Sequence, residues 1–317
     1  MTGQTRRAFL RGAAGAVSAA AALPWGGLSR IARTAEIQIP WKFAICNETF
    51  EGWPFEKAFA FAAECGYQGL EIAPFTISNY VTDISAARRK EVRRQAERAG
   101  LEIIGLHWLL AKTEGFHLTS PDAGVRRKTA KYLADLAEFC AELGGKILVF
   151  GSPKQRNLLP GVSRAEGMKH AAEVFQALVP ALERLDVLLA LEPLTGKETD
   201  FLTTAAQAVE LMHLVGSPRC RLHLDCKAMA SESTPIPELI RRHRREMVHF
   251  HANDPNLRGP GFGQLDFVPI FQALQEVGYR GWVSVEVFDY TPGPERLARE
   301  SIRYMQQCVA KLAARGS

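Results

Sequence analysis

The chain has 317 residues, 47% of them hydrophobic, with 39 basic side chains, 34 acidic ones and six cysteines. This length and apolar content allow a large buried core, which excludes a disordered or collagen-like chain. The cysteines are scattered without a CxxC pair, which excludes a dense disulfide framework, and we expect free thiols.

The first 35 residues have the order of an export signal. Arg6 and Arg7 precede Phe9, and an apolar, alanine-rich run from Ala13 to Leu23 follows. The paired arginines point to the Tat route. The run has about half of the roughly 20 residues needed to cross a bilayer. We therefore predict a Tat-type signal at residues 1–35 and a periplasmic or other extracytoplasmic protein without a stable membrane anchor; a frayed basic helix is the alternative.

The charge of the remaining chain argues against nucleic-acid binding. Residues 1–35 hold five arginines and no acidic residue, so the rest has 34 basic and 34 acidic side chains. Affinity for nucleic acid depends on neutralising phosphates with Lys and Arg. We expect no nucleic-acid partner, and we interpret the basic cluster Arg241–Arg245 as a solvated helix end.

From Lys42 onward, short β-type segments alternate with longer amphipathic helical segments, which indicates repeated βα units around a parallel sheet. In chain order, the expected strands are residues 43–46, 69–72, 101–107, 146–150, 187–192, 220–225, 247–251 and 282–286. The clearest helices between them are residues 55–65, 86–99, 125–143, 165–185 and 267–277. Three helices end before Gly66, Gly100 and Gly278, which can adopt a left-handed conformation. Eight units predict a single-domain α/β fold, a (β/α)8 TIM barrel over residues 36–317, with an open doubly wound sheet as the alternative.

Four consecutive strands end on side chains that bind metals, namely Glu192, Asp225, His251 and Glu286. Because side chains alternate along a strand, these four should face the barrel interior. The residues expected to pack under the outer helices instead are Leu222, Leu224, Val248, Phe250, Val283 and Val285. Three carboxylates and an imidazole that converge at the carboxyl ends of barrel strands are costly without a cation. We therefore predict one divalent ion, either Mn²⁺, Mg²⁺, Co²⁺ or Zn²⁺; a lone strand-end acid is otherwise a helix cap or an ion-pair partner.

These motifs resemble the xylose isomerase-like TIM barrels, in particular the sugar phosphate isomerase/epimerase group with its ketose 3-epimerases and inosose dehydratases. The segments that carry the resemblance are Leu191-Glu192-Pro193, Leu224-Asp225, His249 to Asp254, and Gly278-Tyr279 leading to Val285-Glu286. The resemblance implies that the four strand-end residues bind Mn²⁺ or a similar ion and that Glu192 and Glu286 also move the proton. It further implies that Glu198 is an acid close to the metal ligands or the substrate.

Two positions depart from the pattern of the ketose epimerases. Ala228 stands where those enzymes carry a histidine, and Leu257, followed by Arg258, stands where they carry an arginine. The partners of the substrate oxygens must therefore differ. Ala228, Gln264 and Asp266 also replace ligands that the endonuclease IV branch needs for its three zinc ions, so we do not expect DNA repair.

Further side chains are candidates for contacts with the substrate. Glu71, His107 and Trp108 end the second and third strands and are candidates to line the substrate pocket, although His107 fits a hydrogen-bonded histidine inside the barrel equally well. Lys227 follows the metal aspartate, with a surface lysine as the alternative. The full expected substrate set is Glu71, His107, Glu198, Lys227 and Arg258.

Three other features lie near these residues. His223 and His249 lie one layer below the ligands, where they either hydrogen-bond to the carboxylates or are core histidines. The glycine-rich segment 259–263 lacks the GxGxxG spacing, so we interpret it as an active-site loop.

The leading functional hypothesis is a metal-dependent isomerase or epimerase whose substrate is a sugar with a carbonyl next to a hydroxyl. One glutamate removes the α proton and the other returns it to the opposite face, through an enediolate. Proton removal followed by β-elimination would instead make the protein a lyase or dehydratase of keto-sugars or inositol-like compounds. A barrel that binds a sugar without converting it is the third hypothesis. The sequence is compatible with a homo-oligomer.

Overall fold

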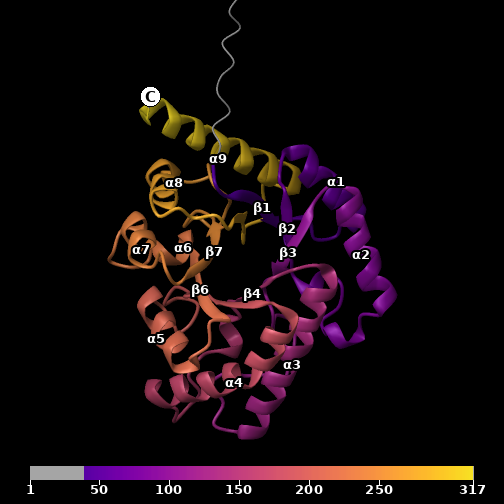
Figure 1. Ribbon diagram of the computed structural model, residues 1–317, viewed down its shortest axis with the longest axis vertical. Helices are drawn as coiled ribbons and strands as arrows, with labels where there is room; N and C mark the ends of the chain where they lie inside the picture. Colours follow the sequence, from indigo (N-terminus) through magenta and orange to yellow (C-terminus); the bar gives the residue numbers. More distant parts are fainter. Residues whose placement is uncertain (1–38, 317) are drawn as a thin grey trace, which may run out of the picture. The chain divides into compact units, whose positions relative to one another are not determined.

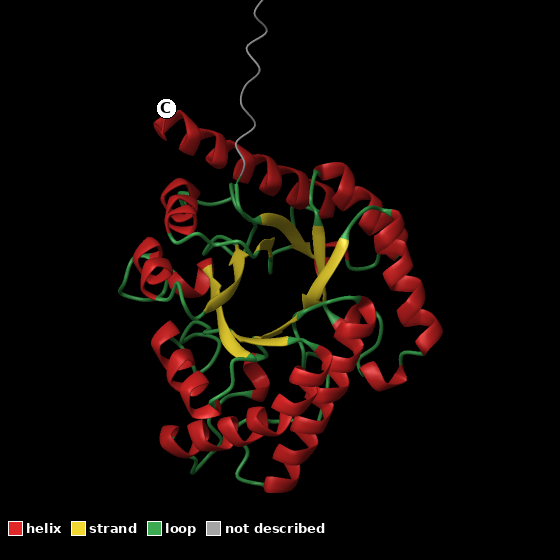
Figure 2. Cartoon of the chain, viewed as in Figure 1, coloured by secondary structure: helices red, strands yellow, loops and turns green. Residues whose placement is uncertain are grey.

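The computed structural model describes residues 39–316, so the predicted export signal lies outside the described residues. Eight parallel strands close into a barrel in the order β1 to β8, and helices surround them (Figures 1 and 2). The strands are β1 (Lys42–Cys46), β2 (Gly69–Ile72), β3 (Glu102–Leu106), β4 (Ile147–Phe150), β5 (Leu188–Leu191), β6 (Cys220–Asp225), β7 (Met247–Ala252) and β8 (Trp282–Val285). Because β1 pairs with β8, the predicted (β/α)8 TIM barrel is confirmed and an open sheet is excluded.

The helices form the outer layer of the barrel. They are α1 (Phe55–Cys65), α2 (Ala86–Arg98), α3 (Ala123–Leu143), α4 (Arg164–Leu185), α5 (Ala205–Val215), α6 (Cys226–Met229), α7 (Ile236–Arg242), α8 (Phe267–Glu276) and α9 (Pro294–Gly316). Short 3-10 turns follow three of the strands, at η1 (Asn47–Phe50), η2 (Pro74–Thr76) and η4 (Pro153–Gln155), and a further one is η3 (Val81–Asp83). The turns at the carboxyl ends of β1, β2 and β4 bring loop residues close to the strand ends.

Local sequence signals fix where several helices begin and end. Gly66, Gly100 and Gly278 have φ values of 101°, 73° and 67°, as predicted for residues that stop a helix in the left-handed conformation. At the start of α4, Ser163 and Glu166 form a capping box in which each side chain accepts a backbone N–H. These signals are local, so the sequence predicts the helix ends well.

The alternation of side chains along β6 to β8 follows the prediction with one exception. Leu222, Leu224 and Phe250 belong to the main hydrophobic core. Val248, in contrast, packs against the separate small cluster Ile147, Val149 and Ala190, so its predicted position under the outer helices is wrong. The pairing register between β6 and β7 shifts by one residue: Leu222 pairs with Met247, but His223 pairs with His249. An extra residue in one strand reverses the alternation locally, and short sequence patterns do not reveal it.

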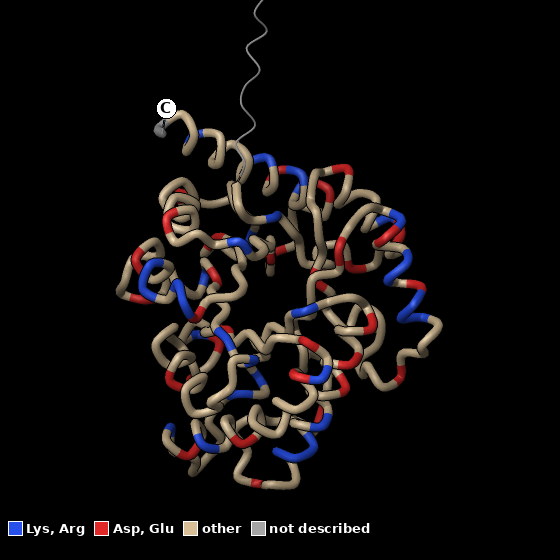
Figure 3. Tube along the Cα trace, in the orientation of Figure 1, with Lys and Arg blue, Asp and Glu red and all other residues tan. Residues whose placement is uncertain are grey.

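The outer surface carries charges of both signs. Figure 3 shows Lys and Arg interspersed with Asp and Glu over the helices. The six cysteines, all of which lie in the described part, are free. Within residues 39–316, no helix combines the length and the hydropathy that crossing a membrane requires.

Candidate active site

The four predicted metal ligands lie at the carboxyl ends of β5 to β8 and all are buried. Glu192, Asp225 and His251 each offer a ligand atom within 4.8 Å of the others, and His223 belongs to the same group. Glu286 is not part of this group and reaches it only through His251, because its Oε2 lies 3.0 Å from the imidazole Nδ1. The ladder pairs Asp225 with His251, which brings these two ligands to the same height in the barrel.

Backbone and amide groups hold the Asp225 carboxylate in place. Its Oδ1 accepts a hydrogen bond from the backbone N–H of Ala228 at 2.7 Å, which caps α6. Its Oδ2 accepts one from the side-chain amide of Asn253, whose own oxygen accepts the N–H of Lys227 at 2.8 Å. Asn253 is fully buried and was not predicted as a site residue, although it stands two positions after His251 in the quoted motif.

A buried acid below the ligands orients His251. The carboxylate of Glu71 lies 3.1 Å from His251 Nε2 and 2.7 Å from His249 Nε2. Glu71 is only 1% exposed, and its carboxylate contacts both imidazoles, so it orients His251. Its contact with substrate stays a prediction.

The electrostatics of this group fit a divalent cation. Burial, together with Glu286 and Asp225, raises the pKa of Glu192 well above its usual range, and burial also raises the pKa of Asp225. Burial raises the pKa of Glu286 as well, but the contact with His251 lowers it by more, so the pKa of Glu286 is below its usual value. Neither ring nitrogen of His223 has a hydrogen-bond partner among the described residues. Carboxylate oxygens and imidazole nitrogens are ligands that Mn²⁺, Mg²⁺, Co²⁺ and Zn²⁺ accept.

A second buried pair lies beside Glu286. Glu48, on η1, contacts His107 Nε2 through its Oε2 at 2.6 Å, and both side chains are at most 2% exposed. Their ligand atoms lie within 4.8 Å of those of Cys46 and Glu286. The hydrogen-bonded alternative for His107 is thus the one the structure shows. Glu48 was missed, although it follows the end of β1 by two residues.

A small cavity of about 30 Å³, which we call the central cavity, lies at the ligands. Glu192, Glu198 and Glu286 line it, so both predicted proton-transfer groups face the same space. The ammonium of Lys227 lies 2.7 Å from Glu198 and 3.8 Å from the ring centre of Phe288. The Lys227 side chain is only 6% exposed, so the alternative of a surface lysine is wrong.

Arg258 does not point to the ligands. Its Nε donates to the Asp289 carboxylate at 2.8 Å, and its terminal nitrogen lies near Thr291. The neighbouring Leu257 is 44% exposed and has a φ of 72°. The structure therefore gives Arg258 an ion-pair partner in the β8 loop, apart from the four ligands.

Arg156, on the short turn after β4, is a site residue that the sequence did not reveal. Its guanidinium is fully buried and donates to the backbone oxygens of Glu192 at 2.7 Å and Phe150 at 2.9 Å. Burial lowers its pKa to about 10. Arg156 thereby ties the carboxyl ends of β4 and β5 together and fixes the backbone that carries Glu192.

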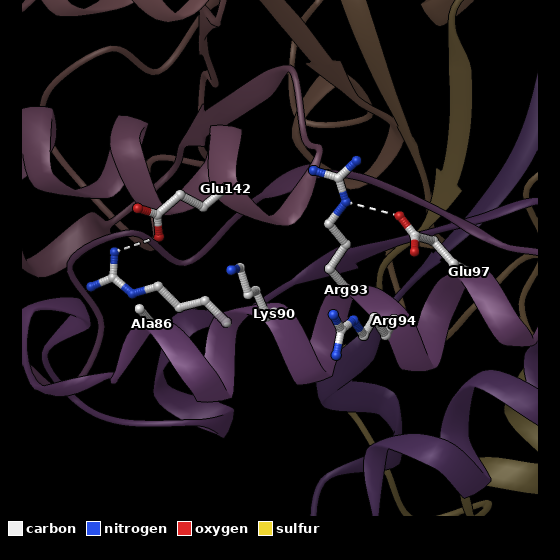
Figure 4. Close-up of a pocket in the computed structure, with 7 residues that line it drawn as sticks. Ala86, Lys90, Arg93, Arg94, Glu97 and Glu142 are labelled. Carbon is white, nitrogen blue, oxygen red and sulfur yellow. Dashed lines mark hydrogen bonds and ion pairs between the residues drawn. The ribbon is translucent and has the colours of Figure 1, made fainter.

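A larger hollow of about 510 Å³ lies on the outer helices (Figure 4). Charged side chains line it, and two of its arginines form ion pairs: Arg89 lies 2.8 Å from Glu142, and Arg93 lies 2.9 Å from Glu97. Ion pairs of this kind are ordinary on helix surfaces. The hollow is therefore not a site for chemistry, which the strand ends provide.

Comparisons with known proteins find similar sequences and a similar fold. The sequence model of a family described as xylose isomerase-like TIM barrel matches residues 59–308. A probable ketose 3-epimerase from Synechocystis sp. is 26% identical over 269 residues, which cover 80% of this chain and 90% of the relative. A fructoselysine 3-epimerase from Escherichia coli O157:H7 is 24% identical, covering 78% of this chain and 91% of that one. The crystal structure of a D-psicose 3-epimerase in the presence of D-fructose superposes with a TM-score of 0.74 at 21% identity, covering 84% of this chain and 99% of that chain.

Proposed function

Because this chain belongs to the xylose isomerase-like TIM barrel family, we propose that it is a divalent-metal-dependent sugar epimerase with Glu192 and Glu286 as its proton-transfer groups. The probable ketose 3-epimerase and the fructoselysine 3-epimerase among its relatives support the predicted isomerase and epimerase class. One observation carries the mechanism: Glu192 and Glu286 line the same cavity, from β5 and β8, with Asp225 and His251 at the strand ends between them.

Glu192, Asp225, His251 and Glu286 would hold the cation. When bound, a divalent ion polarises a substrate carbonyl and offsets the negative charge that develops on its oxygen. Glu71 keeps the imidazole of His251 oriented, and Asn253 with the N–H of Ala228 keeps the Asp225 carboxylate oriented. These contacts reduce the reorganisation needed when the site binds its ligands.

Without a cation, the two glutamates have different environments: contact with His251 favours the ionised form of Glu286, whereas burial among acids favours the protonated form of Glu192. A bound cation would favour the ionised form of both, so the assignment of the acid and base pair rests on the two side chains lining one cavity. A carboxylate takes the proton from the carbon next to the carbonyl, and the electron pair of that C–H bond moves onto the carbonyl oxygen as an enediolate forms. A carboxylic acid on the opposite side returns a proton to the same carbon and inverts it.

Lys227 and Glu198 are the groups we assign to the hydroxyls of the reacting sugar. The position that holds a histidine in ketose epimerases is Ala228, whose side chain offers no hydrogen bond. Lys227 precedes it, is nearly buried and forms an ion pair with Glu198 at the edge of the central cavity. An ammonium and a carboxylate together can donate to and accept from adjacent hydroxyls.

The test is conversion of a panel of free ketoses by metal-loaded protein in D2O, with products followed by NMR. Epimers that carry deuterium at the inverted carbon are expected. An unsaturated product would favour the lyase hypothesis. Saturable binding of several ketoses without any deuterium incorporation would overturn the epimerase and favour a sugar-binding barrel.

A further inference from the structure

The central cavity is too small to hold a sugar by itself. Its volume of about 30 Å³ has room for only one or two water molecules, whereas pockets for small ligands typically measure about 300–1,000 Å³. Two larger pockets share different lining residues with it. A substrate that reaches Glu192 and Glu286 must therefore extend into at least one of them.

The first of these, the lysine pocket, has a volume of about 640 Å³ and lies over the loops after β5 to β8. It shares Glu198 and Phe288 with the central cavity. Its polar wall is the Lys227–Glu198 ion pair. This wall suits the hydroxyls of the reacting sugar, to which Lys227 and Glu198 are assigned above.

The second, the aromatic pocket, has a volume of about 330 Å³ and is lined by the loops after β1 to β4 and, through Tyr290, by the loop after β8. It shares Trp108, Ser152 and Pro153 with the central cavity. Its other walls include two further aromatic rings, Phe75 and Tyr290, and polar side chains. The polar side chains are Glu51, Lys112, Lys154 and Gln155.

Trp108 stands at the boundary between the aromatic pocket and the central cavity. Its φ of 52° is a strained backbone conformation for a bulky side chain, and such strain concentrates at ligand-binding sites. Its ring meets Phe288 and Phe75 edge to face, at centroid distances of 6.1 Å and 6.4 Å. Its indole N–H is buried and meets no acceptor among the described residues. A ligand oxygen at this boundary would supply that acceptor.

We propose that the aromatic pocket is a binding subsite for a second sugar ring, so that the substrate is a keto-sugar joined to another sugar by a glycosidic bond. The inference rests on the proposed function, because the reacting sugar fills the central cavity and the lysine pocket. A monosaccharide leaves the aromatic pocket empty. Flat aromatic faces flanked by a few polar side chains suit the apolar face and the hydroxyl edge of a sugar ring.

Paired substrates test this subsite. D-fructose is compared with isomaltulose and maltulose, two disaccharides in which fructose carries glucose on O6 or O4 and keeps its carbonyl and its 3-hydroxyl free. Metal-loaded mature protein is used for deuterium exchange, which gives kcat/KM, and for calorimetry, which gives Kd. At least one disaccharide should have a kcat/KM about tenfold or more above that of D-fructose, and a Kd lower by a similar factor.

Two exposed side chains serve as matched variants, one in each pocket. Tyr290 is 40% exposed in the aromatic pocket, and Leu257 is 44% exposed in the lysine pocket. Tyr290→Ala should lower the preference for the disaccharide by about tenfold, the size expected for a lost aromatic contact. Leu257→Ala should leave that preference unchanged.

Each outcome decides the proposal. Equal Kd values for D-fructose and both disaccharides overturn it, and so does a preference that Leu257→Ala removes and Tyr290→Ala does not. If no sugar exchanges deuterium, the proposed epimerase function fails, but a disaccharide preference in Kd that depends on Tyr290 still supports the subsite. If D-fructose exchanges deuterium as fast as the disaccharides do, the epimerase function is supported and the proposed subsite is contradicted.

Discussion

The Nδ1 atom of His251 lies 3.0 Å from the Oε2 of Glu286, so the imidazole at the end of β7 and the carboxylate after β8 are in direct contact. The other imidazole nitrogen lies 3.1 Å from Glu71. Both ring nitrogens of His251 thus have carboxylate partners, and a bound metal ion must replace one of these contacts. Metal binding and the protonation of this group are therefore linked.

The mature protein should retain close to one divalent ion per chain, held by the four strand-end ligands. Asp225→Asn and His251→Ala should each empty the site, because each removes a ligand from a small set. Elemental analysis of the purified protein measures the loss. Asp186→Asn, at the exposed end of α4, is the matched control and should keep the ion. Three ions per chain, or full occupancy in both ligand variants, would contradict the assignment.

Metal affinity should weaken as the pH falls. Burial raises the pKa of Glu192 and of Asp225, and although burial lowers the pKa of His251, Glu71 and Glu286 raise it well above its usual value. All three groups therefore hold protons at a higher pH than ordinary side chains, and a cation must displace those protons. Calorimetry in buffers of different ionisation enthalpy should show proton release on metal binding. The number released should decrease as the pH rises through the raised pKa values, and a constant number would be inconsistent with this linkage.

Glu192→Gln and Glu286→Gln should separate proton transfer from metal binding. Glutamine keeps the size and one ligand oxygen but cannot act as a base, so turnover should fall by about 100- to 10,000-fold while much of the metal stays bound. Turnover and metal content are measured on the same samples. Glu64→Gln on the surface of α1 is the control. Near-normal turnover in both site variants would mean that the proton moves through another group.

The Glu48–His107 pair should be essential for stability. Glu48→Ala leaves His107 buried without its carboxylate, and breaking one side of a buried ion pair costs about 3–5 kcal/mol. The free energy of unfolding is measured by urea titration of protein freed of metal by a chelator. Glu51→Ala, which removes an exposed partner of Lys112, should change it by no more than about 0.5 kcal/mol. A similarly small effect of Glu48→Ala would point to a role in substrate binding instead.

Export through the Tat route stays a prediction from the sequence, since residues 1–35 lie outside the described part. Arg6→Lys with Arg7→Lys should leave the precursor inside the cell, because the route reads the arginine pair and not charge alone. Arg11→Lys is the control and should be exported normally. Immunoblots of cell fractions measure this, and an unchanged exported yield of the double variant would rule out the Tat assignment.

The sequence by itself determined the barrel and the chemistry of its strand ends. From His223 to Asp225 and from His249 to His251, after the register shift, side chains alternate as local backbone geometry requires, so the inward direction of Asp225 and His251 could be predicted from the sequence. The same holds for the helix ends at Gly66 and Gly278, where a single residue supplies the left-handed conformation.

Only the tertiary structure decided what surrounds these ligands. His107 contacts Glu48, which lies 59 positions away in the sequence, and His251 contacts Glu71, which lies 180 positions away. Such pairs depend on how the barrel closes and, for Glu71, on the register shift between β2 and β3 beside it, which the alternation of residues along one strand does not reveal. Arg156 reaches the backbone oxygen of Glu192 for the same reason, since its side chain is placed by the path of a loop. The sequence therefore predicted the candidate metal ligands, whereas closure of the sheet placed Glu71 against His251, buried Lys227 and joined Glu48 to His107.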